Sequence, residues 1–291
     1  MPDIFNTLPG IEVPVGQISS ALARMWVDTA AKGGPAPASD EVKATQVNFI
    51  LHLGFGATPE DATQQFRTAV EFSSRYPSRV VVLCPMLSDR SGDALPVMRA
   101  KIYGECFLGK NKGDTRCCEF VILNYSLSAR RFILDMAAAP ADALTYAWPR
   151  PEIIRDLAYA RMLPVRQSIG QFLSRYTPER LSGGLVRVHA GFEEVHAAEG
   201  RALLRWVREK LLACGAEETK VQWEESYLDS KDKLCFSLAF DYADGRHFRW
   251  QGNCHTGIAH FSANLLCTPT ELPAHIKLLE PAQALSEAMF F

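Results

Sequence analysis

The chain has 291 residues, a formal net charge of −2 and an apolar content of 47%, enough to build one large domain or two of ordinary size. Its basic residues are scattered and form no stripe with aromatic residues, which argues against nucleic acid as a partner. No apolar run reaches the roughly 18 to 20 residues of a membrane-spanning helix, and no signal peptide is visible. We therefore expect a cytoplasmic protein with no membrane partner, whose eight cysteines are reduced.

The first predicted elements are a helix over residues 14–31 and a Gly/Pro-rich connection over residues 32–40. A βαβ unit follows. Its first strand, residues 46–54, alternates apolar and polar side chains, and its second, residues 79–84, is apolar throughout, as in a strand covered on both faces. Between them, Thr58-Pro59-Glu60-Asp61 has the pattern of a helix start. The spacing then predicts a buried helix face formed by Ala62, Phe66, Ala69, Val70, Ser73 and Tyr76.

The sequence of the loop after the first strand indicates whether this unit binds a nucleotide. Phosphates often lie at such a helix N-terminus. Gly54 and Gly56 are present, but the third glycine of a dinucleotide fingerprint is absent. Thr58 is placed to occupy the free amides, and Glu60 and Asp61 would repel a phosphate. The pattern favours an ordinary capped crossover. Sugar-phosphate or nucleotide binding, or an enzyme that uses this carboxyl end, is kept as the alternative function.

Two alternating segments, residues 98–108 and 116–125, predict an antiparallel hairpin whose tip is residues 109–114. In such a hairpin Cys106 lies nearly opposite Cys117 or Cys118, depending on register, so these three cysteines are candidates for a redox pair. A short helix over 127–139 and a strand over 144–148 are expected next. A Pro-Arg-Pro sequence then marks a boundary between two domains, residues 1–150 and 151–291.

The second half predicts helices over residues 152–162 and 165–176, separated by Pro164, and a strand over 185–189. A long helix over 193–214, capped by Gly215, carries an apolar face of Leu203, Val207 and Leu211, with Leu204 and Trp206 beside them. Alternating segments beginning near residues 221, 234, 248 and 258 predict a four-stranded antiparallel meander covered by that helix. A final helix spans 282–291. The fold class is α/β (α+β): an N-terminal mixed sheet containing the βαβ unit, and a C-terminal meander.

Sites with recognisable chemistry are not apparent in the sequence. The possible metal ligands Cys254, His255, His260 and Cys267 lack paired short spacings, and we place the two histidines on opposite faces of one strand. No nucleophile elbow or Walker-type phosphate loop is present. We expect no cofactor, no metal and no enzymatic activity.

Several segments resemble the OpcA family of glucose-6-phosphate dehydrogenase assembly proteins. The matching stretches, in the family's order, are Ala44–Leu51, Tyr76–Leu83, Cys117–Glu119, Asp156–Gln167 and Ala198–Leu204. The match depends on three motifs in this order: Pro-Ser-Arg before an apolar strand, Cys-Cys-Glu, and the helix that contains Asp-Leu-Ala. The segment between Glu119 and Arg155 is shorter than its counterpart in the family, so contacts that the family makes through it are not carried over.

The resemblance implies a non-catalytic protein that binds glucose-6-phosphate dehydrogenase, as an assembly factor or allosteric activator of the oxidative pentose phosphate pathway. Aromatic and arginine side chains commonly anchor such interfaces. The candidate anchors are Trp148, Arg161, Arg166, Phe290 and Phe291. Some members of the family are associated with thiol redox control, for which the hairpin cysteines are the candidates here.

Overall fold

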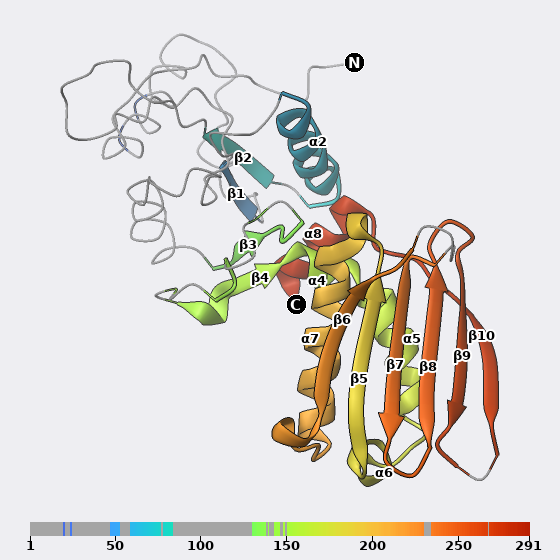
Figure 1. The fold of residues 1–291 in the computed structure, drawn as a ribbon. Coiled ribbons are helices and arrows are strands. Elements are labelled where there is room, and N and C mark those ends of the chain that lie inside the picture. Colours follow the sequence, from blue (N-terminus) through green and yellow to red (C-terminus); the bar gives the residue numbers. More distant parts are fainter. Residues whose placement is uncertain are drawn as a thin grey trace. The chain divides into compact units, whose positions relative to one another are not determined.

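The computed structural model (Figure 1) describes the chain in several stretches. These are residues 47–52, 59–76, 78–83, 130–137, 139, 143–145, 148, 150–229, 234–266 and 268–291, with the single residues 20 and 24. The chain divides into two compact units. The first is Met1–Arg130 with Ala139–Glu152, and the second is Arg131–Ala138 with Ile153–Phe291. This division differs from the expected boundary chiefly at Arg131–Ala138, which we had placed in the first domain.

In the first unit the predicted βαβ unit is confirmed. Strand β1 (Val47–His52), helix α2 (Pro59–Arg75) and strand β2 (Ser78–Leu83) follow one another, and the two strands pair in parallel, with Val47 opposite Ser78. Parallel neighbours cannot be joined by a tight turn. Helix α2 supplies the crossover that returns the chain to the same end of the sheet.

The buried side of α2 differs from the predicted one. Ala69 and Phe72 are 1% and 0% exposed, whereas Phe66 is 36% exposed. Tyr76 continues the Phe72 row, and the two ring centroids lie 4.8 Å apart. The prediction was therefore wrong in placing Phe66 on the buried face. Residues 69, 72 and 76 follow the three-and-four spacing of a single helix stripe, which lies to one side of the stripe that we expected.

Several predicted elements lie outside the described residues. They are the helix over 14–31, of which only Ser20 and Arg24 are described and are helical, the connection over 32–40, and the hairpin over 98–125 with Cys106, Cys117 and Cys118. Their predictions remain predictions.

Two elements predicted before the domain boundary, a helix over 127–139 and a strand over 144–148, differ from those in the structure. We expected a helix over 127–139, but Phe132–Leu134 form strand β3, which pairs in parallel with β4 (Ile154–Asp156) in the second unit. Phe and Ile fit a pleated strand well, and pairing with a distant segment overrides a weak helical pattern. Leu144 and Thr145 lie in a turn, so the strand expected at 144–148 is also wrong there.

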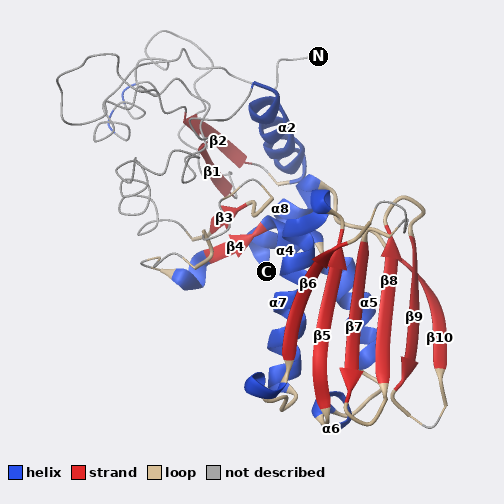
Figure 2. Cartoon of the chain, viewed as in Figure 1, coloured by secondary structure: helices blue, strands red, loops and turns tan. Residues whose placement is uncertain are grey.

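The main layer of the second unit is a six-stranded sheet (Figure 2). In sheet order the strands are β10 (Thr270–His275), β9 (Ile258–Asn264), β8 (His247–Asn253), β7 (Phe236–Tyr242), β5 (Leu185–Phe192) and β6 (Gln222–Tyr227). All neighbouring strands are antiparallel except β5 and β6, which are parallel.

The meander is therefore different from the predicted one. Strands β7, β8 and β9 form it, but its fourth member is β10, where no strand was predicted. Helix α7 (Ala197–Ala213) runs back along one face of the sheet between β5 and β6. Strand β6 therefore pairs in parallel with β5, on the side away from β7, and β5, α7 and β6 make a second βαβ unit. A long helix between two strands generally makes such a parallel crossover. Pro273 is tolerated in β10 because this strand is at the edge of the sheet.

Helices α7 and α5 (Leu163–Leu173) cover one face of the sheet (Figure 1). Along β7, alternate side chains are buried against them, as a strand with one covered face requires. The buried residues of α7 include the predicted Leu203, Val207 and Leu211. Gly215 follows α7 with φ of 98°, as the predicted helix cap requires. Helix α5 adds Phe172, whose ring stacks on Phe261 with centroids 4.5 Å apart.

The two helices expected before β5 have bounds that differ from the predicted ones: α4 begins later than expected, and α5 begins and ends earlier. Residues 154–156 form β4, so α4 is only Leu157–Arg161. The Asp156 carboxylate caps α4 by accepting a hydrogen bond from the Ala158 amide at 2.9 Å. Pro164 lies in the first turn of α5. Proline has no N–H to donate and is compatible with that position, so it starts a helix here where we expected it to separate two.

The remaining elements are short. In the second unit they are α6 (Pro178–Ser182), the 3₁₀ turns η4 (Glu194–His196) and η5 (Glu218–Lys220), and α8 (Pro281–Phe290). The 3₁₀ turn η3 (Pro151–Ile153) lies where the chain passes from the first unit to the second. Helix α8 starts with a capping box between Glu280 and Gln283 and packs on α4 through Ala284, Ala288 and Ala160. In the described part of the chain, no helix combines the length and apolar character needed to cross a membrane.

Candidate functional site

Several reactive side chains lie close together at one end of the strands of the six-stranded sheet. Strands β5 and β8 run in the same direction and opposite to β7, so the carboxyl ends of β5 and β8 meet the amino end of β7 at this end. His196 follows β5 in η4. Cys235 immediately precedes β7, and Cys254 immediately follows β8.

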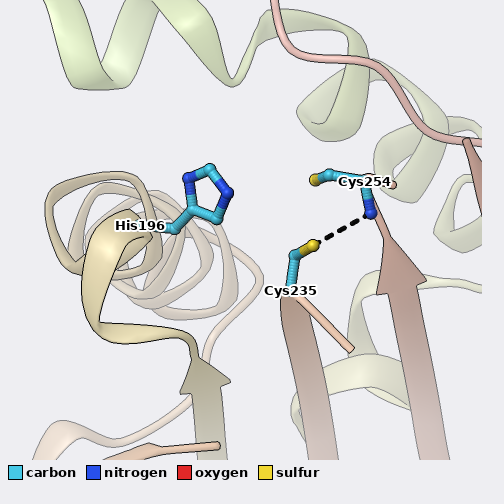
Figure 3. A group of neighbouring side chains, drawn as sticks. All are labelled: His196, Cys235 and Cys254. Atoms are coloured by element: carbon cyan, nitrogen blue, oxygen red, sulfur yellow. Dashed lines mark hydrogen bonds between the residues drawn. The ribbon is translucent and has the colours of Figure 1, made fainter. Parts of the chain in front are cut away.

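His196, Cys235 and Cys254 converge from these three elements (Figure 3). A ring nitrogen of His196 and the two Sγ atoms all lie within 4.8 Å of one another. The Cys254 backbone N–H donates a hydrogen bond to Cys235 Sγ at 3.0 Å. Cys235 is fully buried, and His196 and Cys254 are partly buried. We call these three residues the thiol–histidine cluster.

Glu193 and His255 extend the thiol–histidine cluster. With Cys235 they form a second group whose ligand atoms lie within 4.8 Å of one another. The same oxygen of Glu193, Oε2, lies 4.0 Å from His196 Nε2 and 3.9 Å from His255 Nε2. The side chain of Glu193 is 20% exposed and that of His255 is 71% exposed. Glu193 therefore lies largely inside the protein, and His255 lies at the surface.

Backbone contacts hold these residues in place. The Glu193 N–H donates to the Cys235 carbonyl oxygen at 3.0 Å, which fixes the end of β5 to the start of β7. After β8, the Asn253 side chain accepts hydrogen bonds from the amides of His255 and Thr256, at 2.8 and 3.0 Å. Gly257 closes this turn with φ of 70°, a conformation that glycine adopts without strain. The turn positions Cys254 and His255 at this end of the sheet.

The environment keeps both thiols protonated. Burial, followed by the nearby Cys235 and Glu193, raises the pKa of the Cys254 thiol to about 12. Burial is also the largest cause of the raised pKa of Cys235. A thiol with a raised pKa is a poor nucleophile at neutral pH, so the arrangement does not favour thiolate catalysis. A metal cation, however, can displace the thiol protons and bind the thiolates.

This constellation was not predicted from the sequence. The possible metal ligands identified there were Cys254, His255, His260 and Cys267, but His260 is an exposed residue of β9 and Cys267 lies outside the described residues. His255 lies in the turn before β9, not on the same strand as His260. One signal was available. Cys235 and Cys254 flank the Asp244-Gly245 turn at nearly equal distances along the chain, and residues placed in this way come close across a hairpin. In the observed register Phe236 faces Gly252, so Cys254 lies one residue beyond the position opposite Cys235.

The predicted partner anchors differ in how much of their surface is exposed. Trp148, in the first unit, is 8% exposed, and its Nε1 donates to the Ala143 carbonyl oxygen at 2.8 Å. Phe290 and Phe291, at the end of α8, are 44% and 83% exposed. Two of the five anchors therefore offer a large apolar surface to a partner.

Arg161 and Arg166 are engaged within the second unit. Arg161 donates to Glu199 at 2.6 Å and to both carboxylate oxygens of Asp135, at 2.7 and 2.9 Å. The Arg166 guanidinium lies 3.7 Å from the centre of the Tyr159 ring, and its side chain is 10% exposed. Burial lowers the pKa of Arg166. Both arginines have few atoms to offer another protein.

Two further places bear on ligand binding. An open depression beside α6 contains Arg180 and Arg246, but Arg246 donates to the carbonyl oxygens of Arg180 and Gly183 and to Asp244. Its guanidinium is therefore already occupied by groups of the protein. The residues that follow β1 and β2, where the alternative function would be located, lie outside the described part of the chain.

Comparisons with known proteins give no identification: no family model, no curated protein and no solved structure matches this chain.

Proposed function

We propose that this chain is a non-catalytic protein that binds glucose-6-phosphate dehydrogenase and favours its active assembly, thereby supporting the oxidative pentose phosphate pathway. The observation that carries the proposal is the set of five stretches that resemble the OpcA family and occur in the family's order. The compartment in which it would act is the cytoplasm.

The contacts around α4 support the proposal. Two of the five stretches, Asp156–Gln167 and Ala198–Leu204, are distant in the chain but meet in the second unit. Arg161 from the first stretch donates to Glu199 from the second at 2.6 Å. Asp156 accepts from Arg205, immediately after the second stretch, at 2.8 Å. A fold that depends on these ion pairs requires both stretches, and this is a physical reason for the two stretches to occur together.

An effector of this kind acts by differential binding. It must bind the active state of the dehydrogenase more tightly than the inactive state, by about 1.4 kcal/mol for each tenfold shift in their ratio. It needs no catalytic group of its own, only a surface that distinguishes the two states. The exposed Phe290 and Phe291 are the anchors that we assign to this surface, because large aromatic side chains contribute strongly to interfaces.

The direct test uses the dehydrogenase of the same organism. Its activity and its elution in size-exclusion chromatography are measured with and without this protein at micromolar concentrations. We expect a raised rate and co-elution. An unchanged rate together with separate elution would rule the proposal out.

Variants then locate the surface. Replacing Phe290 and Phe291 together by alanine should weaken binding at least about tenfold, because two exposed anchors are lost. Ile258→Ala is the matched control, since Ile258 is also a large exposed apolar residue (45%) but lies on β9. If both variants bind like the wild type, the surface is elsewhere and the assignment of the two phenylalanines is wrong, although the proposed partner can still be correct.

A further inference from the structure

We propose that the thiol–histidine cluster binds a zinc ion, with Cys235, Cys254 and His196 as ligands and the Glu193 carboxylate as the fourth. Two thiolates, one imidazole and one carboxylate are donors that zinc commonly takes in proteins. The inference is independent of the proposed dehydrogenase partner.

The distances agree with such a site. In a tetrahedral zinc site, ligand bonds of about 2.0 to 2.3 Å place the ligand atoms about 3.3 to 3.8 Å from one another. The ring nitrogen and the two Sγ atoms already lie within 4.8 Å of one another, and Glu193 Oε2 lies 4.0 Å from His196 Nε2. A carboxylate oxygen of Glu193 also lies within 4.8 Å of Cys235 Sγ. On binding, the ion would draw the ligand atoms somewhat closer to one another.

The charge balance also favours a cation. Glu193 is a largely buried carboxylate, and within the described part of the chain its ion-pair neighbours are the two histidines His196 and His255. An isolated buried carboxylate is costly unless a positive charge compensates it. A divalent ion between Glu193 and the two sulfurs would supply that charge. On binding it would displace the protons of the two thiols.

The donor set selects among metals. Sulfur ligands favour zinc and other thiophilic ions over magnesium and calcium, which prefer oxygen ligands. His255, at the surface of the cluster and 3.9 Å from Glu193, is suited to position the carboxylate. The four proposed ligands come from three segments at one end of the sheet. The ion would therefore link η4, the start of β7 and the turn after β8.

The test measures metal directly in the full-length chain. The protein is purified without a histidine tag and under reducing conditions, and its zinc content is determined by mass spectrometry of the metal. We expect one zinc ion per chain. After removal of zinc, titration with Co²⁺ should produce a thiolate-to-cobalt charge-transfer band and the intense visible bands of a tetrahedral site. Chelation should lower the thermal unfolding temperature, because a ligand that binds only the folded state stabilises it.

The variants are chosen to show whether the metal binds at this site or at other cysteines and histidines of the chain. Cys254→Ser and His196→Ala should lose the metal and the cobalt spectrum, and Glu193→Gln should bind zinc at least about tenfold more weakly. Cys214→Ser and His260→Ala are the controls. Cys214 is a free, partly buried cysteine at the end of α7, and His260 is an exposed histidine of β9. Both controls should retain one zinc ion.

Three results would overturn the proposal. The first is reduced wild-type protein that neither retains zinc nor binds Co²⁺ stoichiometrically. The second is a Cys254→Ser variant that keeps the metal, because binding would then belong to other residues. The third is a Cys235–Cys254 disulfide that persists under the reducing conditions. Far-ultraviolet circular dichroism of each variant would distinguish loss of the metal ligand from unfolding of the chain.

Discussion

At the scale of single residues, Arg161 shows how a plausible binding residue can be a structural one. Its side chain is 16% exposed and lies between Asp135 and Glu199, whose side chains are 31% and 6% exposed. Burial alone would lower the pKa of Arg161, but the hydrogen bonds and charges of the two carboxylates outweigh it and raise the pKa. The arginine is thus permanently charged and compensates the charges of the buried Glu199 carboxylate and the partly exposed Asp135 carboxylate.

Replacing Arg161 by methionine should therefore destabilise the protein. Removing one member of a buried ion pair leaves the other charge uncompensated, at a cost of about 3 kcal/mol. Arg201→Met is the matched control, because Arg201 and Glu225 form an exposed pair 3.0 Å apart, with side chains 47% and 41% exposed. Such pairs contribute about 1 kcal/mol at most. Urea unfolding monitored by circular dichroism measures both changes.

The double variant Arg161→Met, Glu199→Gln adds a check. Because Glu199→Gln removes the uncompensated charge, the double variant should be more stable than the sum of the two single changes predicts. A loss at Arg161 no larger than that at Arg201 would show that the Arg161 cluster contributes little to stability. In that case Arg161 would again be a reasonable candidate for contacting the dehydrogenase.

At the scale of elements, the close approach of α7 to β5 is made possible by Gly200. A Cβ atom at this position would lie 2.7 Å from the Cβ of Phe192 and closer still to its ring. Phe192 is 1% exposed, so it has little room to move. Glycine lowers the stability of an isolated helix by about 1 kcal/mol relative to alanine. Here the packing of a helix on a strand requires it.

Replacing glycine by alanine should therefore change the free energy of unfolding in opposite directions at two helical glycines, one tightly packed and one with open space beside it. Gly200→Ala should destabilise the protein by about 1 to 3 kcal/mol, because overpacking outweighs the gain in helix propensity. Gly170→Ala, in α5, should stabilise it by up to about 1 kcal/mol, since no atom lies within 4 Å of the added Cβ. Thermal or urea unfolding of the two variants gives the signs. Equal signs would mean that the α7–β5 packing is looser than these distances imply.

At the scale of the whole molecule, the two compact units are not continuous in sequence. The second unit takes Arg131–Ala138 from the chain before Ala139–Glu152, which belongs to the first unit. This short segment supplies β3, which pairs with β4, and Asp135, which accepts two hydrogen bonds from Arg161. A boundary placed at a single point in the sequence would therefore separate the second unit from one of its strands.

Two fragments test this organisation. A fragment of residues 131–291 contains the whole second unit and should unfold cooperatively. A fragment of residues 153–291 lacks β3 and Asp135 and should be less stable by at least about 1 kcal/mol, because the Arg161 donors and the β4 backbone lose hydrogen-bond partners. Urea unfolding of the two fragments compares them directly. Equal stability would mean that residues 131–138 do not contribute to the fold of the second unit.

The sequence by itself determined the local features of this protein. Thr58-Pro59-Glu60-Asp61 and the alternation along β7 predict a helix start and a strand with one covered face, and both are found. These signals depend on residues close together in the chain, because helix and strand periods and turn preferences act over a few residues.

Only the tertiary structure decided which distant segments meet. It placed β5 between β6 and β7, made a strand of Phe132–Leu134 by pairing it with β4, and buried Arg161 between two carboxylates. It also brought His196 to Cys235 and Cys254. Strand pairing and burial depend on contacts between residues far apart in the chain. The free energy of such contacts is set by what surrounds each side chain after folding, which local periodicity does not encode.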